Sequence, residues 1–553
     1  MSTVSHDGAA RALTPGKTIF DYADELAVEV PTSCRRRGTC HECVVEITEG
    51  MAALSAPSEA ESFLRGDYRL ACQAVIERDD TDIAFAPLRR APRILTVSRP
   101  KAAIEHDPMV TRRGEDVFYD GEAVEPYRGH IYGLAIDLGT TTVVMDLIDL
   151  ETGASLRTSA FENPQRFGGS DVMNRISYDG TDDTGELKRA VVTAINRELR
   201  VLSRRGFPRR AIYEVVVAGN ATMRDILFGL DVQSIGQKPY KSLVEHDYLA
   251  GRRADTALRE NARGLGLSVN PGARAYGLPL IGSHVGGDAA ADLMAVEMTA
   301  CPDAIVMLLD IGTNAEIVLG GGGRMVAASC PAGPAFEGGL VKYGMAGYDG
   351  AIETIRRDAA GGWDFKTIGD APAEGLCGSG LIDLLAELRR HGIMTPKGVF
   401  TDDRKRFDID VVPERGITFS KEDASHLAQA KAANYCGQFI VLREFGIDPS
   451  DVTKLYLAGG FANTIDIGNA IDIGFLAPVP RERIVKVGNA SIQGAREVLL
   501  SKRKRRALEE AVKAIEHIEL ETTPDFFDIF VEACQLKPMP AVLRPAARRA
   551  HAT

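Results

Sequence analysis

The sequence predicts an α/β protein in two parts, a small cysteine-rich N-terminal domain and a much larger duplicated domain. Four of the nine cysteines lie within the first 72 of the 553 residues. From Ile131 onward, short apolar strands alternate with long helical stretches, which is typical of a sheet covered by helices. A strand–turn–strand unit containing Asp137 recurs around Asp310, 173 residues later. A period this long excludes a solenoid and predicts two similar halves with a cleft between them.

The composition is that of a folded globular protein and excludes several classes of function. Hydrophobic residues make up 45% and charged residues 26% of the chain, and the net charge is −12. A net-negative surface argues against nucleic acid or an anionic membrane as a partner. No apolar run reaches the ~18–20 residues of a membrane helix, and the first fifteen residues lack the apolar stretch of a secretory signal. We therefore expect a cytoplasmic protein.

The N-terminal domain is expected to span residues 16–88. KTIFDYADELAVEVP is an amphipathic segment that ends at Pro31, and CVVEITEG is a strand that ends at a glycine turn. Residues 89–130 contain four prolines, and their composition suits a linker. The other predicted boundaries are a flexible N-terminus at 1–15, a first half at 131–303, a second half at 304–537 and a flexible basic tail at 538–553.

Each predicted half begins with two strands around a Gly/Thr turn. These units are IYGLAIDLGTTTVVMDLIDLETG from Ile131 and AIVMLLDIGTNAEIVLGGGG from Ala304. Each half also contains a strand that runs into glycine, EVVVAGNATM at 214–223 and LYLAGGFAN at 455–463, and we expect a helix directly after the second.

The N-terminal cysteines have the spacing expected of a metal centre. Cys34, Cys40, Cys43 and Cys72 follow the pattern C-x5-C-x2-C-x28-C. Three thiolates from one loop and a fourth from a later segment suit either tetrahedral zinc or an iron–sulfur cluster. The spacing alone leaves both open.

The sequence around these cysteines resembles 2Fe–2S ferredoxins of the plant and vertebrate type, in the variant with five residues between the first two cysteines. The matching segments are PTSCRRRGTCHECVVEI and RLACQAV. The resemblance implies a β-grasp domain whose 2Fe–2S cluster is bound by Cys34, Cys40, Cys43 and Cys72.

The cysteine loop departs from these ferredoxins in having less glycine. Arg35, Arg36, Arg37 and His41 surround the single Gly38, so few positions should adopt positive φ and aim N–H groups at cluster sulfurs. The positive charge should favour the reduced cluster and raise its potential. Alternatively, the arginine run docks an acidic redox partner.

The duplicated turns have the design of a phosphate site. In DLGTTT at 137–142 and DIGTNAE at 310–316, an apolar strand ends at an Asp before a Gly-Thr turn. The turn exposes N–H groups and hydroxyls that cradle phosphate oxygens, and the Asp can hold Mg²⁺ through water. One copy is also compatible with a plain hairpin turn, but two copies after buried strands favour a nucleotide site.

These elements, in this order, resemble the superfamily of acetate and sugar kinases, heat-shock chaperones and actin. The resemblance implies two ribonuclease-H-like halves that bind ATP and Mg²⁺ in the cleft between them. It places Asp137 and Asp310 near the metal as catalytic residues. It places Gly139, Thr140, Thr141, Gly312, Thr313 and Asn314 along the phosphates, and Gly459 and Gly460 at the adenosine.

Three other residues in glycine-rich segments are weaker candidates for the cleft. Asp288 is either a ligand or the N-cap of the helix that follows it. Cys330 and Cys377 are better explained as small semi-buried side chains than as a second redox site. No general base can be named from the sequence.

The combination of a ferredoxin unit with an ATP cleft resembles the ATP-dependent reductive activators of corrinoid proteins. The segments FGGSDVMNRI at 167–176, GNATM, VGGDAAAD and GLCGSGLID carry this likeness over most of the chain. It implies an ATP-dependent oxidoreductase that transfers an electron to an inactive Co(II) corrinoid protein and restores Co(I) for methyl transfer. It also implies an upstream electron donor. Long members of this family carry an extra domain before the ATPase that is expected to help dimerisation. Residues 89–130 are too short for that domain, so whether this protein forms a homodimer stays open.

Three other functions remain open. The first is a small-molecule kinase whose cluster is a redox regulator. The second is an ATP-driven electron donor to a non-corrinoid enzyme such as a radical dehydratase. The third is a chaperone-like ATPase with a zinc staple.

Overall fold

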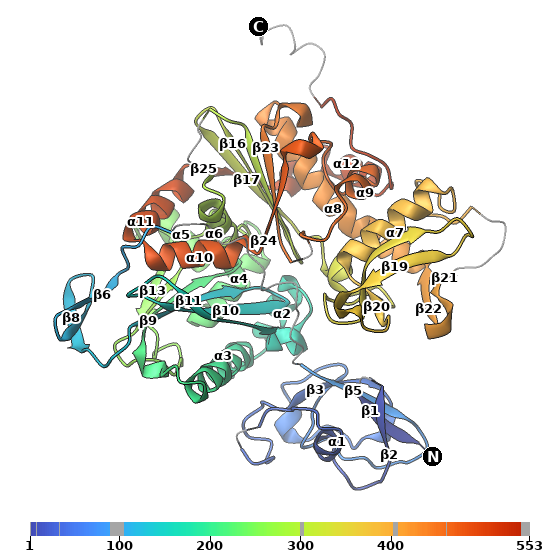
Figure 1. Cartoon of the computed structure of the whole chain (residues 1–553), viewed down its shortest axis with the longest axis horizontal. Coiled ribbons are helices and arrows are strands. Elements are labelled where there is room, and N and C mark those ends of the chain that lie inside the picture. Colours follow the sequence, from blue (N-terminus) through green and yellow to red (C-terminus); the bar gives the residue numbers. More distant parts are fainter. Residues whose placement is uncertain are drawn as a thin grey trace, which may run out of the picture.

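The computed structural model describes residues 2–6, 8–32, 34–88, 104–298, 303–401, 408–460 and 462–543. A small N-terminal domain lies beside a large domain of two lobes (Figure 1). No helix in these ranges has both the length and the apolar character needed to cross a bilayer.

The N-terminal domain is a five-stranded sheet of order β2-β1-β5-β3-β4 with one helix, α1 (Ile19–Glu25). Thr18 starts α1 through a capping box with Asp21, and Ile19 and Tyr22 bury one face of the helix. The strands are β1 (Thr3–His6), β2 (Ala9–Ala12), β3 (Val44–Glu49), β4 (Tyr68–Leu70) and β5 (Ile83–Pro87).

The prediction of a flexible N-terminus at 1–15 was wrong. β1 pairs with β2 and runs parallel to β5, and Val4 is fully buried in the core. The partner strand β5 lies about eighty residues away in the chain, so a pattern of four residues gave no local signal for it.

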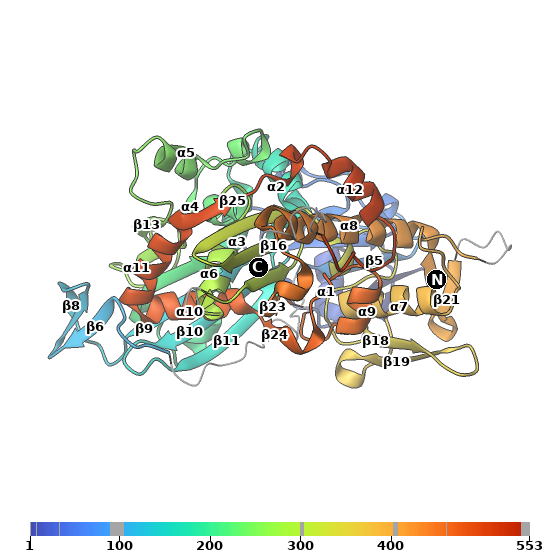
Figure 2. The ribbon, with the colours of Figure 1, turned by 90° about the horizontal axis from the view of Figure 1, so that it is seen from above.

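The segment 89–130 is also more ordered than a linker. β6 (Val110–Arg113), β7 (Asp116–Tyr119) and β8 (Glu122–Pro126) form a three-stranded sheet. The sheet is anchored to the first lobe, because the Tyr119 hydroxyl donates to Glu214 over 3.0 Å and the Tyr213 hydroxyl donates to Glu125 over 2.8 Å. It lies at the opposite end of the molecule from α7 and α9 (Figure 2). Residues 89–103 lie outside the described residues.

The two lobes share one sheet topology, which confirms the predicted duplication. Each has three antiparallel strands followed by two parallel ones, in the order β11-β10-β9-β12-β14 in the first lobe and β17-β16-β15-β23-β24 in the second. One strand extends each sheet, β13 (Leu258–Asn261) and β25 (Ile515–His517). The shared strands are β9 (Tyr132–Leu138), β10 (Thr142–Asp149), β11 (Ser155–Glu162), β12 (Ile212–Ala218), β14 (Arg274–Gly277), β15 (Val306–Ile311), β16 (Ala315–Gly321), β17 (Arg324–Cys330), β23 (Lys454–Ala458) and β24 (Ile484–Gly488).

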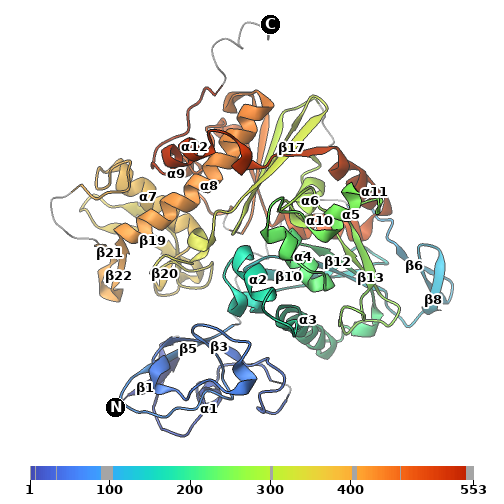
Figure 3. The ribbon, with the colours of Figure 1, turned by 180° about the vertical axis from the view of Figure 1, so that it is seen from behind.

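Helices cover both lobes. Figure 3 shows α2 and α3 on the side of the first lobe that faces the N-terminal domain, and the long α8 across the second lobe. The first lobe carries α2 (Val172–Asp179), α3 (Glu186–Arg204), α4 (Ala221–Phe228), α5 (Leu243–Leu249) and α6 (Gly287–Ala295). The second carries α7 (Gly378–Arg390), α8 (Lys421–Phe445), α9 (Ile467–Asp472), α12 (Phe526–Ala533) and the small sheets β18 (Ala351–Arg357), β19 (Trp363–Thr367), β20 (Gly375–Leu376) and β21 (Asp408–Val412), β22 (Ile417–Ser420).

The second half is not the continuous segment 304–537 that the sequence predicted. α10 (Ala490–Leu500) and α11 (Lys502–Ala511) return to the first lobe, where Leu499 and Leu508 join the core cluster around Ile131. Sequence order alone does not show which lobe an amphipathic helix covers. The predicted tail is also shorter, because Met539 is buried. Residues 544–553 lie outside the described residues.

The contact between α10 and α6 depends on Gly494. A Cβ added there would lie 1.9 Å from the Ala291 carbonyl oxygen. We expect Gly494→Val to lower the free energy of unfolding by about 3 kcal/mol or more, because the two helices must separate. Chemical denaturation measures this. Ala507→Val on the exposed face of α11 is the control. Equal stability of the two variants would contradict this packing.

Candidate functional site

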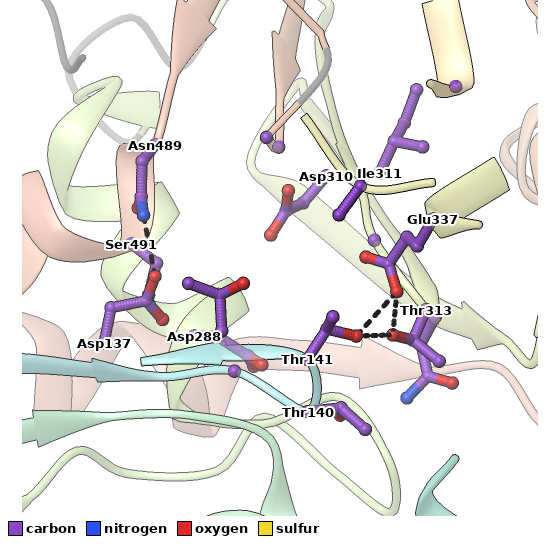
Figure 4. Close-up of a pocket in the computed structure, with 18 of the residues that line it drawn as sticks. Asp137, Thr140, Thr141, Asp288, Asp310, Ile311, Thr313, Glu337, Asn489 and Ser491 are labelled. Carbon is purple, nitrogen blue, oxygen red and sulfur yellow. Dashed lines mark hydrogen bonds between the residues drawn. The ribbon is translucent and has the colours of Figure 1, made fainter. Parts of the chain in front are cut away.

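All ten residues predicted at the nucleotide line one cleft between the lobes. Its open volume, including solvent at the mouth, is about 1100 Å³. Figure 4 shows the carboxylates of Asp137 and Asp310 facing into this cleft from opposite lobes. The predicted residues on its lining are Asp137, Gly139, Thr140, Thr141, Asp310, Gly312, Thr313, Asn314, Gly459 and Gly460. Their roles toward a nucleotide stay predictions.

Each of the two Gly-Thr turns is closed by a hydrogen bond from the N–H group of its glycine. Gly139 N–H donates to the Thr142 carbonyl over 3.0 Å, and Gly312 N–H donates to the Asn314 carbonyl over 2.9 Å. A Cβ on Gly139 would lie 2.7 Å from the Thr142 oxygen, so only glycine fits this turn. The turns bring the hydroxyls of Thr141 and Thr313 within 3.1 Å of each other across the cleft.

Glu337 joins the two turns. It ends the short 3₁₀ helix η8 (Pro334–Glu337), and its Oε2 accepts hydrogen bonds from the hydroxyl of Thr141 over 2.8 Å and from that of Thr313. Burial raises the pKa of this carboxyl. The sequence reasoning noticed this glycine-rich segment only for Cys330. The signal it overlooked was a single carboxylate among glycines.

Five carboxyl groups gather where the lobes meet. Asp137, Asp288, Asp310 and Glu316 line the cleft, and the fully buried Asp292 lies one turn after Asp288 on α6. Burial, and then repulsion from its neighbours, raises the pKa of Asp288 to about 7. Burial likewise raises the pKa of Asp137 to about 6, although Asn489 and Ser491 donate to it. So many buried carboxylates without cations are costly unless protons or a bound cation neutralise them.

Asp288 is not the N-cap of its helix, which is Gly286. Asp288 lines the cleft, and its role as a ligand stays a prediction. Asn220 and Asn489 are the N-caps of α4 and α10, and both also line the cleft. Sequence reasoning did not single them out as site residues. The sequence signal that could have identified them is the similarity between AGNAT at 218–222 and VGNAS at 487–491.

Gly459 has a structural reason for being glycine. Its φ is +107°, and a Cβ there would lie 2.1 Å from the Ile311 carbonyl oxygen. The helix expected directly after Gly460 begins only at Ile467. Cys377 lines the cleft, whereas Cys330 is buried against Gly437 of α8.

The four N-terminal cysteines form two pairs. The Sγ atoms of Cys43 and Cys72 lie 3.3 Å apart. The Thr32 hydroxyl lies 3.9 Å from Cys34 Sγ and 4.0 Å from Cys40 Sγ, which places these two thiols side by side. Two cysteines for each iron are the ligand arrangement of a four-cysteine 2Fe–2S centre.

Backbone N–H groups point at these sulfurs. Burial raises the pKa of Cys34, but hydrogen bonds from Cys40 and the N–H groups of Arg37 and Thr39 outweigh it and bring the pKa to about 6. A hydrogen bond from Cys43, with one from Gly38 N–H, lowers the pKa of Cys72 to about 6. Cys34 and Cys72 are therefore stabilised as thiolates, the form that binds metal, whereas the hydrogen bond to Cys72 and burial raise the pKa of Cys43.

The glycine-poor loop was expected to offer fewer easy positions at positive φ, and three residues other than glycine adopt positive φ in it. Arg35, Arg36 and His41 adopt φ of 54°, 63° and 56°, beside Gly38 at 76°. Each non-glycine residue in this region costs ~1–2 kcal/mol. Arg36 stacks on Phe20 at 4.1 Å and pairs with Asp21 and Asp24, which helps to hold the loop. Two of the three arginines are turned toward their own domain, because Arg37 also donates to the Cys34 carbonyl.

The cysteine loop contacts the first lobe through His41. Its Nδ1–H donates to the Glu186 carboxylate over 3.0 Å, and its ring stacks on Phe63 at 4.2 Å. Phe63 meets Phe167 of the first lobe edge-to-face at 5.5 Å, and its carbonyl accepts from the Tyr178 hydroxyl over 2.5 Å. His41 follows Cys40 directly, so the interface adjoins the four cysteines.

The same interface connects to the Gly-Thr turn at Gly139–Thr141. Phe167 lies in the short helix η4 (Pro164–Gly168), which Asn163 caps. Asn163 N–H donates to the Thr141 carbonyl over 2.7 Å, and its Nδ2 donates to the Gly139 carbonyl over 2.8 Å. A displacement of the turn at Gly139–Thr141 (the first phosphate turn of the sequence prediction) therefore acts on η4, which contacts the N-terminal domain.

Comparison with known proteins adds independent support. Three family models match, the 2Fe–2S iron–sulfur cluster binding domain at 4–77, the RACo middle region at 132–300 and the C-terminal ASKHA domain of RACo at 304–546. The corrinoid activation enzyme RamQ of Eubacterium limosum is 26% identical over 93% of this chain and 95% of its own length. The [Co(II) methylated amine-specific corrinoid protein] reductase of Methanosarcina barkeri is 24% identical over 73% of this chain and 77% of its own.

A solved structure agrees with these relatives over the whole chain. The reductive activator for corrinoid, iron–sulfur protein superposes with a TM-score of 0.71 at 26% identity, and the match covers 99% of this chain and 100% of that one. The three matched models follow one another along the chain in the order of its domains. This chain belongs to the RACo family, with a 2Fe–2S binding domain, a RACo middle region and an ASKHA C-terminal domain.

Proposed function

We propose that this protein is an ATP-dependent reductive activator of a corrinoid protein. It transfers an electron from a 2Fe–2S cluster to the inactive Co(II) form and restores the Co(I) form needed for methyl transfer. The observation that carries the proposal is the presence, on one chain, of a four-thiol centre and a two-lobed cleft joined by a common interface. The names of the relatives matched over most of this chain support the choice of a corrinoid acceptor.

The N-terminal domain would hold the cluster through Cys34, Cys40, Cys43 and Cys72. The paired sulfurs and the inward N–H groups fit a negatively charged 2Fe–2S centre. The cluster supplies one electron at a time. The chain itself binds the irons, stabilises the charge on the sulfurs by hydrogen bonding and holds the centre beside the ATPase lobe.

The cleft would bind ATP with Mg²⁺. The turns at Gly139–Thr141 and Gly312–Asn314 offer N–H groups and hydroxyls to phosphates. Asp137, Asp288 and Asp310 present the oxygen donors that Mg²⁺ prefers, and the cation would relieve their mutual repulsion.

Nucleotide binding would reach the cluster through the contacts of Asn163, Phe167 and His41. Electron transfer to a lower potential is unfavourable by a factor of ten for every ~59 mV. ATP can offset this only by acting differently on two states of the protein or of its complex. Movement of the first phosphate turn, passed through η4 to Phe63 and His41, provides such a difference. The upstream donor, a homodimer and a cytoplasmic location stay predictions.

The nature of the metal centre is the first test. We expect about two irons per chain and a rhombic spin-half EPR signal after anaerobic reduction with dithionite. Cys43→Ser should abolish the signal, while Cys534→Ser, a cysteine remote from the loop, should leave it intact. One zinc per chain without a signal would instead support a chaperone-like ATPase or a kinase.

The activity is tested with purified Co(II) corrinoid proteins of methyltransferase systems. The reduced protein should produce the Co(I) absorption only with ATP and Mg²⁺. In Asp310→Asn, ATP and Mg²⁺ should no longer bring about this absorption. His41→Ala should keep the cluster signal and ATP hydrolysis but slow Co(I) formation about tenfold. The variant lacks the hydrogen bond to Glu186 and the ring contact with Phe63, so a movement of the first lobe would act less on the N-terminal domain. Phosphorylation of a small acceptor without any Co(I) would overturn the proposal in favour of a kinase.

Magnesium binding should depend on pH through the raised carboxyl pKa values. A carboxyl whose pKa is raised by folding stabilises the fold when protonated, and this stabilisation is lost as the pH rises from about 4 through 6–7. We therefore expect Mg²⁺ to raise the melting temperature more at pH 8 than at pH 5.5. Asp288→Asn should reduce the difference. An equal shift at both pH values would contradict a magnesium site at these carboxylates.

A further inference from the structure

A second cavity adjoins the nucleotide cleft at its phosphate end. It shares Thr140, Thr141 and Glu337 with the cleft. Its open volume, including solvent, is about 1230 Å³, and the N-terminal domain contributes Glu46 and Pro87 to its wall. The cavity is thus bounded by the N-terminal domain and by both lobes, and a group leaving the phosphate turns on this side would enter it.

Arg175 of α2 lines this cavity and is only 1% exposed. Its Nε donates to the Gly169 carbonyl over 2.9 Å, and its Nη1 donates to Gln165 Oε1 over 3.4 Å and to Met223 Sδ over 3.1 Å. All three acceptors are neutral. Within the described part of the chain, this guanidinium forms no ion pair with a carboxylate.

The three other buried arginines of the described ranges each have a carboxylate partner. Arg69 pairs with Glu61 at 2.8 Å, Arg224 with Asp225 at 2.7 Å and Arg505 with Glu214 at 2.8 Å. An unpaired buried cation is costly, and an apolar side chain of similar volume is often at least as stable in its place. Fold stability therefore does not explain Arg175, and an anionic ligand would.

The local chain is built to hold this side chain in place. Gly169 has φ of +138°, and a Cβ there would lie 2.4 Å from the Asn174 Cβ. The close turn aims the Gly169 carbonyl at Nε of Arg175. Arg175 also acts on Glu337, because its charge opposes the effect of burial on the pKa of that carboxyl. The guanidinium is therefore within electrostatic reach of the point where the phosphate turns meet.

We propose that Arg175 binds the terminal phosphoryl group of the nucleotide in the second cavity, as the γ-phosphate of bound ATP or as inorganic phosphate after hydrolysis. The inference rests on the proposed function, because it takes a nucleotide in the cleft. A guanidinium offers a planar array of donors that matches phosphate oxygens and stays charged when buried. Nη1 already has weak neutral acceptors, so phosphate oxygens would replace poor partners with strong ones.

Occupation of this cavity would be felt by the N-terminal domain. Arg166 lies on the same wall and pairs with Glu162 of the first lobe at 2.7 Å and with Glu46 of the N-terminal domain at 3.2 Å. A phosphoryl group beside Arg175 adds negative charge next to this bridge. Hydrolysis and phosphate release would then change the electrostatics of the contact that holds the cluster domain.

The test compares Arg175→Met with wild type by isothermal titration of the full chain. The probes are ADP, the non-hydrolysable analogue adenylyl imidodiphosphate, and inorganic phosphate added to the ADP complex. We expect ADP affinity to change less than twofold. Affinity for the analogue, for phosphate or for both should fall about 10- to 100-fold, the worth of charged hydrogen bonds. A loss with the analogue identifies the γ-phosphate as ligand, and a loss with phosphate identifies the free ion.

Two controls separate binding from structure. Lys342→Met removes a positive charge from an exposed side chain at the rim of the same cavity and should change these affinities less than twofold. Arg175→Met should melt no lower than wild type. An unchanged ratio of analogue to ADP affinity together with an unchanged affinity for phosphate, or an equal loss of affinity for all probes with a lower melting temperature, would overturn the inference. Wild-type protein that binds neither nucleotide would overturn the proposed function as well.

Discussion

The burial of five carboxyl groups at the junction of the lobes is the constraint on which the rest of the structure depends. Asp137 and Asp310 are the last residues but one of strands β9 and β15 in opposite lobes, and α6 adds Asp288 and Asp292. Their repulsion would drive the lobes apart if all were ionised and uncompensated. The lobes are nevertheless joined through Glu337, which accepts from a threonine of each phosphate turn. Because a nucleotide would use the same hydroxyls, the bridge and the ligand compete for one set of donors.

The interface between the N-terminal domain and the first lobe is the second element of the design. Apolar residues of both form one continuous buried cluster, from Val4 and Phe85 to Leu134 and Leu199. Over this core lie the stacked rings of His41 and Phe63 and the ion pair of Arg166 with Glu46. An interface with both apolar and charged contacts can be shifted by modest changes in charge. That property suits a domain whose position has to depend on the state of a distant cleft.

The sequence revealed what is encoded locally and missed what depends on distant partners. The cysteine spacing predicted that four thiols come together, and the two Asp-x-Gly-Thr turns with AGGFAN predicted ten residues of the cleft, because each is a short local motif. The pairing of β1 with β5, the sheet at 110–126 and the return of α10 could not be predicted, since their partners lie far away in the chain. Glu337 and Arg175 were missed for a related reason. A lone charged residue acquires meaning only when its neighbours in space are known. In the loop around Gly38, Arg35 and Arg36 adopt positive φ although the composition offers few residues that do so easily, and the sequence alone did not show which residues would.

The path of the chain between the lobes has a consequence for how the protein is assembled. After β24 the chain leaves the second lobe, forms α10 and α11 on the first, and returns to the second as β25. The first lobe is therefore completed by residues synthesised more than two hundred positions after its own last strand, β14, which ends at Gly277. Leu499 fills the space over Gly133, and this space would be open until then. During translation the core of the first lobe therefore stays incomplete until α10 and α11 have been synthesised. The two halves, although duplicates in topology, are not separable modules, and a gene truncated between them would encode neither lobe in stable form.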